Sequence, residues 1–452
     1  MIRIRMLVLA SCAVSAGGGA LVACGTDDNR LGFIGDPDSG SEASSPPPSL
    51  PPTTDASQPV DADADADAGA PSRPDYDASD EAVVCTETPC VKQLAAGDNH
   101  FCALLDDGTV SCWGDNYRGA LGTGITTRVY AAPQTVVGVG NVTQIRAQGL
   151  TTCVRTSEGR VKCWGQNLQG QLGLQVSPPV SDSSYHATAT EVPLEAGVER
   201  VDVGARAVCA LASDGVDVYC WGGNDQKQLA RADAGSVGGP GLVDGQGFQL
   251  SRTAGGLASV FGITKSGELV GWGAVSGRPA SISPTTIMAP IPSLEGVTSL
   301  ASGTAHQCVI ASGEVYCWGT NSRGLLGTGI SDSETSPAPA ALAADAGVYP
   351  QQVAASPYRT CVRMTDGTVQ CAGWDERGQL GRGDAGTYSL AFVPVSTLQE
   401  EYVVQIATSY FATCALVQGG KVVCWGGNTG GELGMGMTDS NPHPAPVPVV
   451  FP

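Results

Sequence analysis

The stretch SCWGDNYRGALG, residues 111–122, decides the fold because it recurs along the chain. Close copies begin at Cys163, Cys317 and Cys424, and altered copies begin at Cys220, Gly271 and Cys371. Counted from Cys112, neighbouring copies are 46 to 57 residues apart, and each holds one of the 7 tryptophans. A period near 50 residues with a Trp-Gly motif predicts a repeat fold, either a propeller or a solenoid.

The residues before each copy predict antiparallel hairpins. In the first unit, alternating apolar residues run to Gly97, and an apolar segment then leads to a turn at Asp107 and Gly108. Asp-Gly turns between apolar runs are typical of hairpins. The 61 glycines and 29 prolines, with only 15% charged residues, disfavour helices. We therefore predict an all-β fold in which residues 85–452 form a closed seven-bladed β-propeller.

The same hairpins pair the cysteines. Pairing across the first Asp-Gly turn places Cys102 opposite Cys112, within reach of a disulfide. In the fourth unit both positions change together, to Phe261 and Gly271, as expected for two sulfurs that pair with each other. Metal binding would need Cys-x-x-Cys spacing or clustered histidines, which the sequence lacks. The predicted disulfides are Cys85–Cys90, Cys102–Cys112, Cys153–Cys163, Cys209–Cys220, Cys308–Cys317, Cys361–Cys371 and Cys414–Cys424.

The N-terminal residues predict export. Residues 1–23 resemble a signal peptide, because Arg3 and Arg5 precede an apolar run that ends in Leu-Val-Ala before Cys24. This run resembles the lipobox of bacterial lipoproteins, so we expect a lipid anchor on Cys24; the alternatives are lipidation at Cys12 and cleavage without lipidation. Residues 24–84 are expected to form a disordered acidic linker, since residues 27–84 hold 14 acids and 2 bases among Pro, Ala and Ser. The predicted location is the bacterial cell envelope, in the outer membrane or at the cell surface.

No motif in the sequence points to catalysis. His100 and His306 share one repeat position, which favours a packing role, and His186 and His443 are the other two histidines. Nucleophile-elbow, zinc-protease and phosphate-loop motifs do not occur. The net charge is −20, and the sequence has no basic stripe suited to nucleic acid. We predict a protein that is not an enzyme, uses no cofactor or metal, and does not bind nucleic acid.

The order Gly-x-x-His-x-Cys, turn, Cys-Trp-Gly-x-Asn-x-x-Gly-x-Leu-Gly resembles the regulator of chromosome condensation repeat over residues 85–452. The resemblance implies seven blades, closed by pairing strands from the two chain ends, with residues 447–450 as the C-terminal contributor. Members of this family include a nuclear exchange factor for a small GTPase, a plant ultraviolet-B photoreceptor and a secreted bacterial β-lactamase inhibitor. Export and paired cysteines argue against exchange activity in this chain.

We therefore expect a monomeric, lipid-anchored binding or scaffolding module whose partner is an unidentified protein or surface polymer. Variable segments follow Gly-x-Leu-Gly and should share one rim; Tyr185, His186 and Arg278 are the candidate contact residues within them. The alternatives are an inhibitor of a secreted enzyme, an exchange factor, or an enzyme in the propeller channel. Acids from several blades facing the channel would favour an enzyme, whereas an exposed aromatic patch would favour a binder. The longest variable segments are 174–190, 231–247, 274–292 and 330–348.

Overall fold

The computed structural model describes residues 81–86, 88–244, 247–275, 284–398 and 401–451. Cys12, Cys24 and Arg278 lie outside the described residues, so the expected anchor and one expected contact residue are not placed. The chain divides into two compact units, 1–69 and 70–452, and the features below belong to the second. Within the described part of the chain, no helix has the length and hydropathy needed to cross a membrane.

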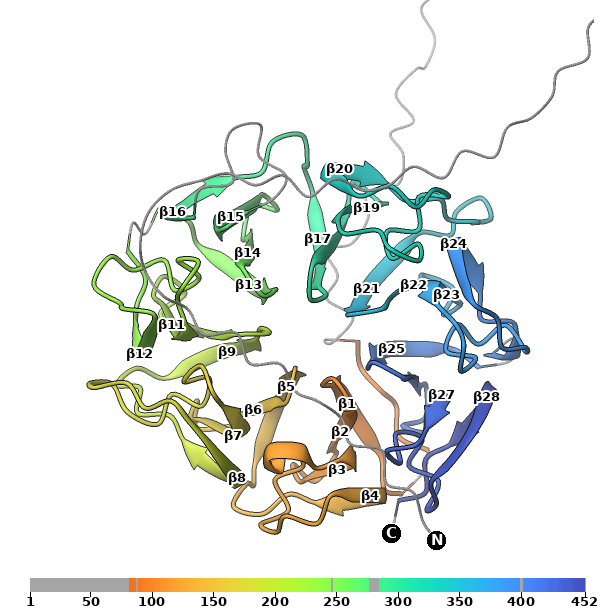
Figure 1. The fold of residues 1–452 in the computed structure, drawn as a ribbon, viewed down its shortest axis with the longest axis horizontal. Helices are drawn as coiled ribbons and strands as arrows, with labels where there is room; N and C mark the ends of the chain where they lie inside the picture. The colour runs from red at the N-terminus through yellow and green to blue at the C-terminus, as the bar shows by residue number, and fades with distance from the viewer. Residues whose placement is uncertain (1–80, 87, 245–246, 276–283, 399–400, 452) are drawn as a thin grey trace, which may run out of the picture. The chain divides into compact units, whose positions relative to one another are not determined.

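The second unit is the predicted seven-bladed propeller (Figure 1). Each blade is a four-stranded antiparallel sheet of four consecutive strands, ordered from the innermost to the outermost. The innermost strands of neighbouring blades contact one another, and β1 contacts β25, which closes the ring. Closure of the ring leaves each four-stranded sheet with only short unpaired edges, which limits edge-to-edge pairing with other chains.

The first four blades hold the following strands. Blade 1 contains β1 (Val91–Ala96), β2 (His100–Leu105), β3 (Val110–Asp115) and β4 (Val129–Thr135), with the short helix η2 (Tyr117–Gly119). Blade 2 contains β5 (Val142–Gln148), β6 (Thr151–Thr156), β7 (Val161–Asn167) and β8 (Asp182–Glu191). Blade 3 contains β9 (Val198–Val203), β10 (Ala207–Ala212), β11 (Val218–Gly223) and β12 (Val237–Leu242). Blade 4 contains β13 (Leu250–Gly255), β14 (Ser259–Thr264), β15 (Leu269–Gly273) and β16 (Thr285–Pro290).

The last three blades follow the same plan. Blade 5 contains β17 (Val297–Ser302), β18 (His306–Ala311), β19 (Glu314–Gly319) and β20 (Glu334–Pro339). Blade 6 contains β21 (Pro350–Ser356), β22 (Arg359–Met364), β23 (Val369–Trp374) and β24 (Tyr388–Pro394), followed by the short helix η3 (Ser396–Leu398). Blade 7 contains β25 (Val403–Thr408), β26 (Ala412–Val417), β27 (Val422–Asn428) and β28 (Asp439–Pro448).

Six of the seven disulfides lie inside the hairpins between second and third strands, and Cys85–Cys90 precedes β1. Cys102 is paired with Cys112 in the sheet register, with 4.1 Å between their Cα atoms. In blade 4, Phe261 lies opposite Gly271, and its ring lies 3.1 Å from where a Cβ on that glycine would be. The phenyl ring therefore fills the volume that a disulfide occupies in the other blades. All seven predicted pairs are bonded: Cys85–Cys90, Cys102–Cys112, Cys153–Cys163, Cys209–Cys220, Cys308–Cys317, Cys361–Cys371 and Cys414–Cys424.

The hydrophobic core is distributed over the interfaces between blades. Between blades 1 and 2, one cluster joins Leu104 and Cys112 to Ile145, Val154 and Trp164. Burial of apolar surface stabilises a fold by about 25 cal/mol per Å². Because each of these clusters draws on two blades, a blade completes its core only when its neighbour is folded.

The closure of the ring differs from the closure that the family resemblance implies. Blade 7 consists of four consecutive strands from the C-terminal part of the chain, and among the residues that the structure describes no strand from the N-terminal end enters its sheet. Val447 pairs with Cys424 inside this blade. Blades 1 and 7 instead meet side by side, and the backbone nitrogen of Val91 donates to the carbonyl of Gly420 at 2.9 Å. In the described part of the chain, the ring is therefore closed by contacts between two four-stranded blades.

The contacts of the propeller begin before Cys85. Val83 is buried, and its carbonyl accepts a hydrogen bond of 2.7 Å from Lys92 Nζ. The carboxylate of Glu81 binds the guanidinium of the buried Arg363 in blade 6. Residues 81–84, which the sequence analysis assigns to the linker, therefore contact the folded unit.

Candidate functional site

The propeller has two faces with different loops. The inner strands end at one face, where the third strand of each blade also ends; we call this the loop face. The opposite face, which we call the hairpin face, carries the Asp-Gly turns such as residues 106–108. The four long variable segments leave third strands at the loop face. They are not loops throughout, because they contain the outermost strands β8, β12, β16 and β20.

The asparagine of the recurring motif shapes the segment that follows the third strand. Asn116 is fully buried, and its side-chain oxygen accepts a hydrogen bond of 3.1 Å from the backbone nitrogen of Leu121. Its amide nitrogen donates to the carbonyls of Ile125 and Thr127 at 3.0 and 2.9 Å. One side chain thus satisfies three backbone groups of an irregular segment. The same bond to a leucine nitrogen recurs at Asn167, Asn224, Asn321 and Asn428.

The tryptophan of the motif joins its blade to the preceding one. The indole nitrogen of Trp164 in blade 2 donates to the carbonyl of Ala120 in blade 1 at 2.9 Å. A Cβ on Gly122, whose φ is +68°, would lie 2.8 Å from that nitrogen, so only glycine fits beneath the indole. Trp221, Trp272, Trp425 and Trp113 make the equivalent bonds, and the bond from Trp113 to Glu432 links blade 1 to blade 7.

Two buried histidines extend this contact between blades. The Thr152 hydroxyl donates to the Ala120 carbonyl, so its oxygen accepts from His100 Nε2 at 2.9 Å. His306 and Thr360 repeat the arrangement between blades 5 and 6. The imidazoles therefore carry a proton on Nε2. Burial lowers the pKa of both to about 4, opposed at His100 by the charge of Asp115, so the rings are neutral at pH 7. Their shared repeat position serves packing, as the sequence predicts.

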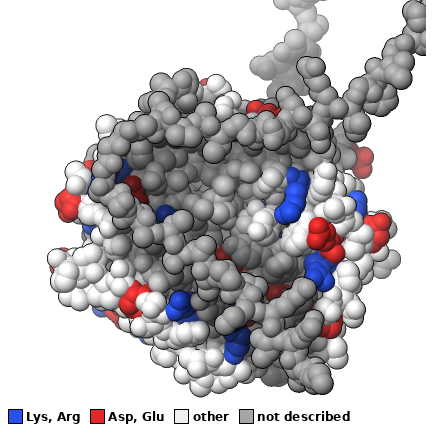
Figure 2. Space-filling view, in the orientation of Figure 1, with Lys and Arg blue, Asp and Glu red and all other residues white. Residues whose placement is uncertain are grey.

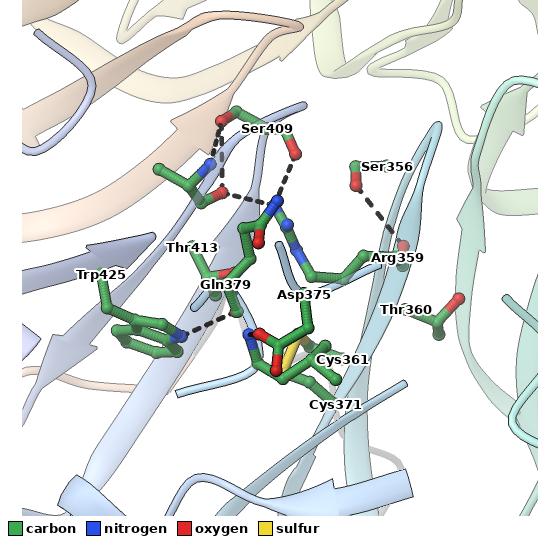
Figure 3. The surroundings of a disulfide bond; sticks show 12 residues. Ser356, Arg359, Thr360, Cys361, Cys371, Asp375, Gln379, Ser409, Thr413 and Trp425 are labelled. Atoms are coloured by element: carbon green, nitrogen blue, oxygen red, sulfur yellow. Dashed lines mark hydrogen bonds between the residues drawn. A yellow bond between two sulfur atoms is a disulfide. The ribbon is translucent and has the colours of Figure 1, made fainter. Parts of the chain in front are cut away.

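Arg359 takes the histidine position in blade 6 (Figure 3). Its guanidinium is fully buried and donates to the carbonyls of Ser409 and Ala412 in blade 7 at 2.6 and 2.7 Å. Burial lowers the pKa of Arg359 to about 9, and the nearby carboxylate of Asp375 opposes that effect. The contact between blades 6 and 7 therefore depends on an arginine where other contacts use a neutral histidine.

Blade 6 departs from the motif in other ways. Asp375 replaces the asparagine; its Oδ1 still accepts from Leu380, and its Oδ2 lies 2.9 Å from Arg382 Nε. Ala372 occupies the usual tryptophan position, and the ring of Phe392 from β24 packs over Gly327 instead of an indole. The tryptophan of this blade, Trp374, ends β23 and is only partly buried. Trp374 is therefore not part of the core, unlike the tryptophans of the other six blades.

Trp374 belongs to an aromatic cluster on the loop face, which we call the Trp374 cluster. It consists of Arg323, Tyr358, Trp374, Tyr410 and Phe411, drawn from blades 5, 6 and 7. Ring centroids of Tyr358 lie 5.4 Å from those of Trp374 and Tyr410, and the guanidinium of the exposed Arg323 lies 5.7 Å from the Trp374 ring. Tyr358 is 39% exposed. Aromatic side chains with an adjacent arginine are the residues most enriched at binding hot spots.

A second cluster includes one of the predicted contact residues. Tyr185 is 47% exposed and lies edge-on to Tyr117, with 6.2 Å between ring centroids. Arg118 lies over both rings, and Arg128 lies 5.0 Å from the Tyr117 ring. We call these four residues of blades 1 and 2 the Tyr117 cluster. The structure thus places Tyr185 beside aromatic and basic neighbours.

His186, the other predicted contact residue that the structure describes, is half-buried and paired with a carboxylate. Its Nε2 lies 3.0 Å from Asp182 Oδ1 on the same strand, and Asn167 donates to the other carboxylate oxygen at 3.0 Å. Burial opposes ionisation of Asp182, but hydrogen bonds from Asn167, His186 and Ser184 hold its pKa well below the usual range. His443 and Asp439 repeat this pair in blade 7. The repetition indicates that His186 orders its strand.

The acidic side chains that line the channel come from blades 1 and 3. The channel carries Asp98 and Asp202, but Asp202 is paired with Arg200 at 2.9 Å. Among the described residues, no group of three or more His, Cys, Asp or Glu could hold a metal ion. Where Figure 2 colours the surface, acidic and basic side chains are interspersed, without a large field of one sign. The Trp374 cluster is the feature that stands out.

Comparisons with known proteins identify the repeat. Residues 91–120, 142–171, 351–379 and 403–432 match a family model of the regulator of chromosome condensation (RCC1) repeat, and a second model of this repeat matches residues 312–362. The chain therefore carries RCC1 repeats and folds as a seven-bladed β-propeller.

Relatives by sequence have diverse roles. The ultraviolet-B receptor UVR8 of Arabidopsis thaliana is 26% identical over 358 residues, which cover 76% of this chain and 78% of the receptor. The E3 ubiquitin-protein ligase HERC2 of Homo sapiens is also 26% identical, over 75% of this chain. That match spans only 7% of the ligase, so the chain corresponds to a small part of that protein.

Solved structures agree on the fold. Prp20p of Saccharomyces cerevisiae, whose binding to Gsp1p and histones has been studied, matches with a TM-score of 0.64 and 19% identity over 80% of this chain and 88% of Prp20p. The same yeast protein bound to Kap60 matches with a TM-score of 0.65 and 18% identity, over 80% of this chain and 85% of that chain. Human WBSCR16 matches with a TM-score of 0.62 and 18% identity, over 74% of this chain and 88% of that chain.

Proposed function

We propose that this protein is an exported, lipid-anchored binding module that holds another protein of the bacterial envelope on the loop face of its propeller. The observation that carries the proposal is the Trp374 cluster. Large rings contribute contact area at a low cost in side-chain entropy, and an arginine beside them adds directional hydrogen bonds. The cluster combines the two on one exposed surface of three blades.

The relatives support a binding role in general terms. RCC1-like propellers include proteins that bind other proteins, as the structure of yeast RCC1 with Kap60 illustrates. Similarity at less than 20% identity supports a shared fold but not a shared binding partner. Gsp1p, histones and Kap60 are therefore not proposed as partners of this chain. Inhibition of a secreted enzyme would use the same kind of surface, and capture of such an enzyme in the crosslinking test below would indicate it.

Crosslinking on intact cells, followed by mass spectrometry, tests the proposal. The double variant Tyr358→Ala/Trp374→Ala removes two rings from the cluster and should lose the crosslinked partner. Tyr402→Ala is the matched control, because Tyr402 is also exposed (40%) but precedes β25 at the hairpin face, away from the cluster. Equal capture by all three proteins, with unchanged melting temperatures, would refute binding through this surface.

The proposed anchor is tested separately. One lipobox cysteine should carry the acyl chains, and acyl chains hold a protein to a bilayer with about 0.8 kcal/mol per buried methylene. The Cys24→Ser variant should move from the membrane fraction to the soluble fraction, while Cys12→Ser should stay with the membrane. Retention of Cys24→Ser in the membrane fraction would argue against lipidation at that residue.

A further inference from the structure

Basic residues recur at the tips of the loop face. In blades 1, 5 and 6, an arginine stands two positions after the buried Asn or Asp that follows the third strand. In blade 3, a lysine stands one position further along the same segment. We call these four residues the basic tips: Arg118, Lys227, Arg323 and Arg377.

Three of the basic tips have a backbone conformation that disfavours long side chains. The φ angles of Arg118, Lys227 and Arg323 are +61°, +63° and +67°. Glycine adopts this left-handed region readily, whereas a Cβ crowds the backbone there. The position of Lys227 is glycine in the five other blades in which the structure describes it: Gly119, Gly170, Gly324, Gly378 and Gly431. Local conformation therefore does not account for a lysine, and a strained residue of this kind points to a role at the surface.

The charges of the basic tips are not neutralised within the fold. Arg118 and Arg377 each donate from Nη1 to a backbone carbonyl of the next blade. The guanidinium of Arg323 lies over the Trp374 ring at 5.7 Å. Among the residues that the structure describes, no carboxylate forms an ion pair with any basic tip. These cations therefore remain available to carboxylates from outside the chain.

The two faces of the propeller differ in charge. The tip segments of the loop face hold the four basic tips against two acids, Asp225 and Glu376. The turns of the hairpin face hold five acids and one base: Asp106, Asp107, Glu158, Asp214, Asp366 and Lys265. An acidic partner would therefore be attracted to the loop face and repelled by the hairpin face, which orients it as it approaches.

The spacing of the basic tips indicates the size of the ligand. They belong to blades 1, 3, 5 and 6, which Figure 1 shows distributed around the ring. A ligand that contacts all four must span the mouth of the channel, as a protein surface can. Arginine forms paired hydrogen bonds with carboxylates. We propose that the partner docks on the loop face with an acidic surface whose carboxylates bind the basic tips. This inference rests on the proposed function, because it gives the chemistry of the protein that the loop face holds.

Titration with fluorescently labelled poly-L-glutamate at about 0.05 M salt tests the charge of the ligand. The wild type should bind saturably, and Arg118→Gln/Lys227→Gln should bind about tenfold more weakly because two surface charges are lost. Arg160→Gln/Lys265→Gln is the matched control, since it makes the same charge change at the hairpin face and should bind like the wild type. At about 0.5 M salt, screening should remove the difference. Absence of saturable binding to the wild type, or equal loss in the control, would overturn the proposal.

Capture on intact cells separates this inference from the proposed function. Arg118 and Lys227 lie outside the Trp374 cluster, and Arg118→Gln/Lys227→Gln should reduce capture of the partner at an unchanged melting temperature. Full capture by this variant, with capture lost in Tyr358→Ala/Trp374→Ala, would overturn the acidic partner and leave the proposed function standing. Full capture by both variants would refute the proposed function as well. Tighter binding of alginate, a carboxylate polysaccharide, than of poly-L-glutamate would indicate a surface polymer and overturn the protein partner.

Discussion

Single residues decide how neighbouring blades of this propeller hold together. In blades 1, 5 and 6, a histidine or arginine stands two positions before the first cysteine of the hairpin. The next blade then has a threonine facing it: Thr152, Thr360 and Thr413. In blade 6 the basic residue is Arg359, which donates to backbone carbonyls instead. The Thr413 hydroxyl donates to Gln379, so its oxygen can still accept from an imidazole.

Arg359 offers a direct test of this pairing. Arg359→Ala should lower the free energy of unfolding by about 3 kcal/mol, because it removes two charge-assisted hydrogen bonds between the blades and takes the guanidinium donor from the Ser409 carbonyl. Arg359→His should lose clearly less, since the imidazole can donate to Thr413 as His100 does to Thr152. Urea titrations at pH 7 measure both. Equal losses would show that the histidine position in blade 6 does not share the geometry of blades 1 and 5.

The two buried histidines predict how stability depends on pH. Their pKa falls from 6.5 to about 4 on folding because burial disfavours the charged ring. The unfolded chain binds these protons first, so their contribution is complete above pH 6.5 and is lost as the pH falls to 4. The loss is on the order of 3 kcal/mol per histidine at pH 4. A His100→Gln/His306→Gln variant should lose less stability than the wild type between pH 7 and pH 4.

Two carboxyl groups act in the opposite direction in this range. Burial raises the pKa of Asp98 to about 6, against a hydrogen bond from Tyr410, and burial raises that of Glu432 to about 7. Their contributions are complete below their unfolded pKa values, near 4, and are lost as the pH rises through 6 to 7. Both are present in wild type and variant, so the difference between the two urea titration series isolates the histidines. Parallel pH profiles would contradict the neutral, buried state of the rings.

At the scale of the element, the hairpin and its disulfide form one unit. Blade 4 is the exception, where Phe261 fills the space opposite Gly271 and contacts Trp318 edge-on at 5.4 Å. A Phe261→Cys/Gly271→Cys variant should form an eighth disulfide, because the paired register is the same as in the other hairpins. Closing so short a loop stabilises a protein by about 2 to 3 kcal/mol, offset here by the lost phenyl contact.

Intact mass after alkylation without reductant reads out this disulfide. The double variant should take up no alkyl group at the two new cysteines. The single variant Phe261→Cys should take up one, which confirms that the position can be reached by the reagent under the denaturing conditions used. Two alkyl groups on the double variant would mean that blade 4 departs from the hairpin geometry of its neighbours.

Much of the element scale was predictable from the sequence. The period, the Asp-Gly turns and the joint change at Phe261 and Gly271 predicted the blades and the disulfides, because strand pairing is local and follows turn arithmetic. The roles of Asn116 and Trp164 were not predictable. Their partners lie in a later loop and in the preceding blade, and one sequence does not reveal such contacts.

The whole molecule shows why the candidate surface was missed. Members of the Trp374 cluster lie up to 88 residues apart, from Arg323 to Phe411, and only the closed ring brings them together. The sequence did carry a signal, since Trp374 stands two positions away from its repeat position. Residues that match the repeat motif form the interfaces between blades. A residue that departs from the motif, such as Trp374, can instead lie at the surface. Tyr185 was a candidate from the sequence because it lies in a variable segment, and its role as a contact residue stays a prediction.

Hydrogen exchange of the protein, free and bound to the partner recovered by crosslinking, tests most directly whether the loop face is the binding surface. Amide exchange slows where a partner excludes water, so the protected segments identify the docked face. Slowed exchange is predicted at residues 358–359, 374–378 and 409–412, which carry the four aromatic residues of the Trp374 cluster, with no change at the turns 106–108 and 365–367. Protection confined to those turns on the hairpin face would contradict the account.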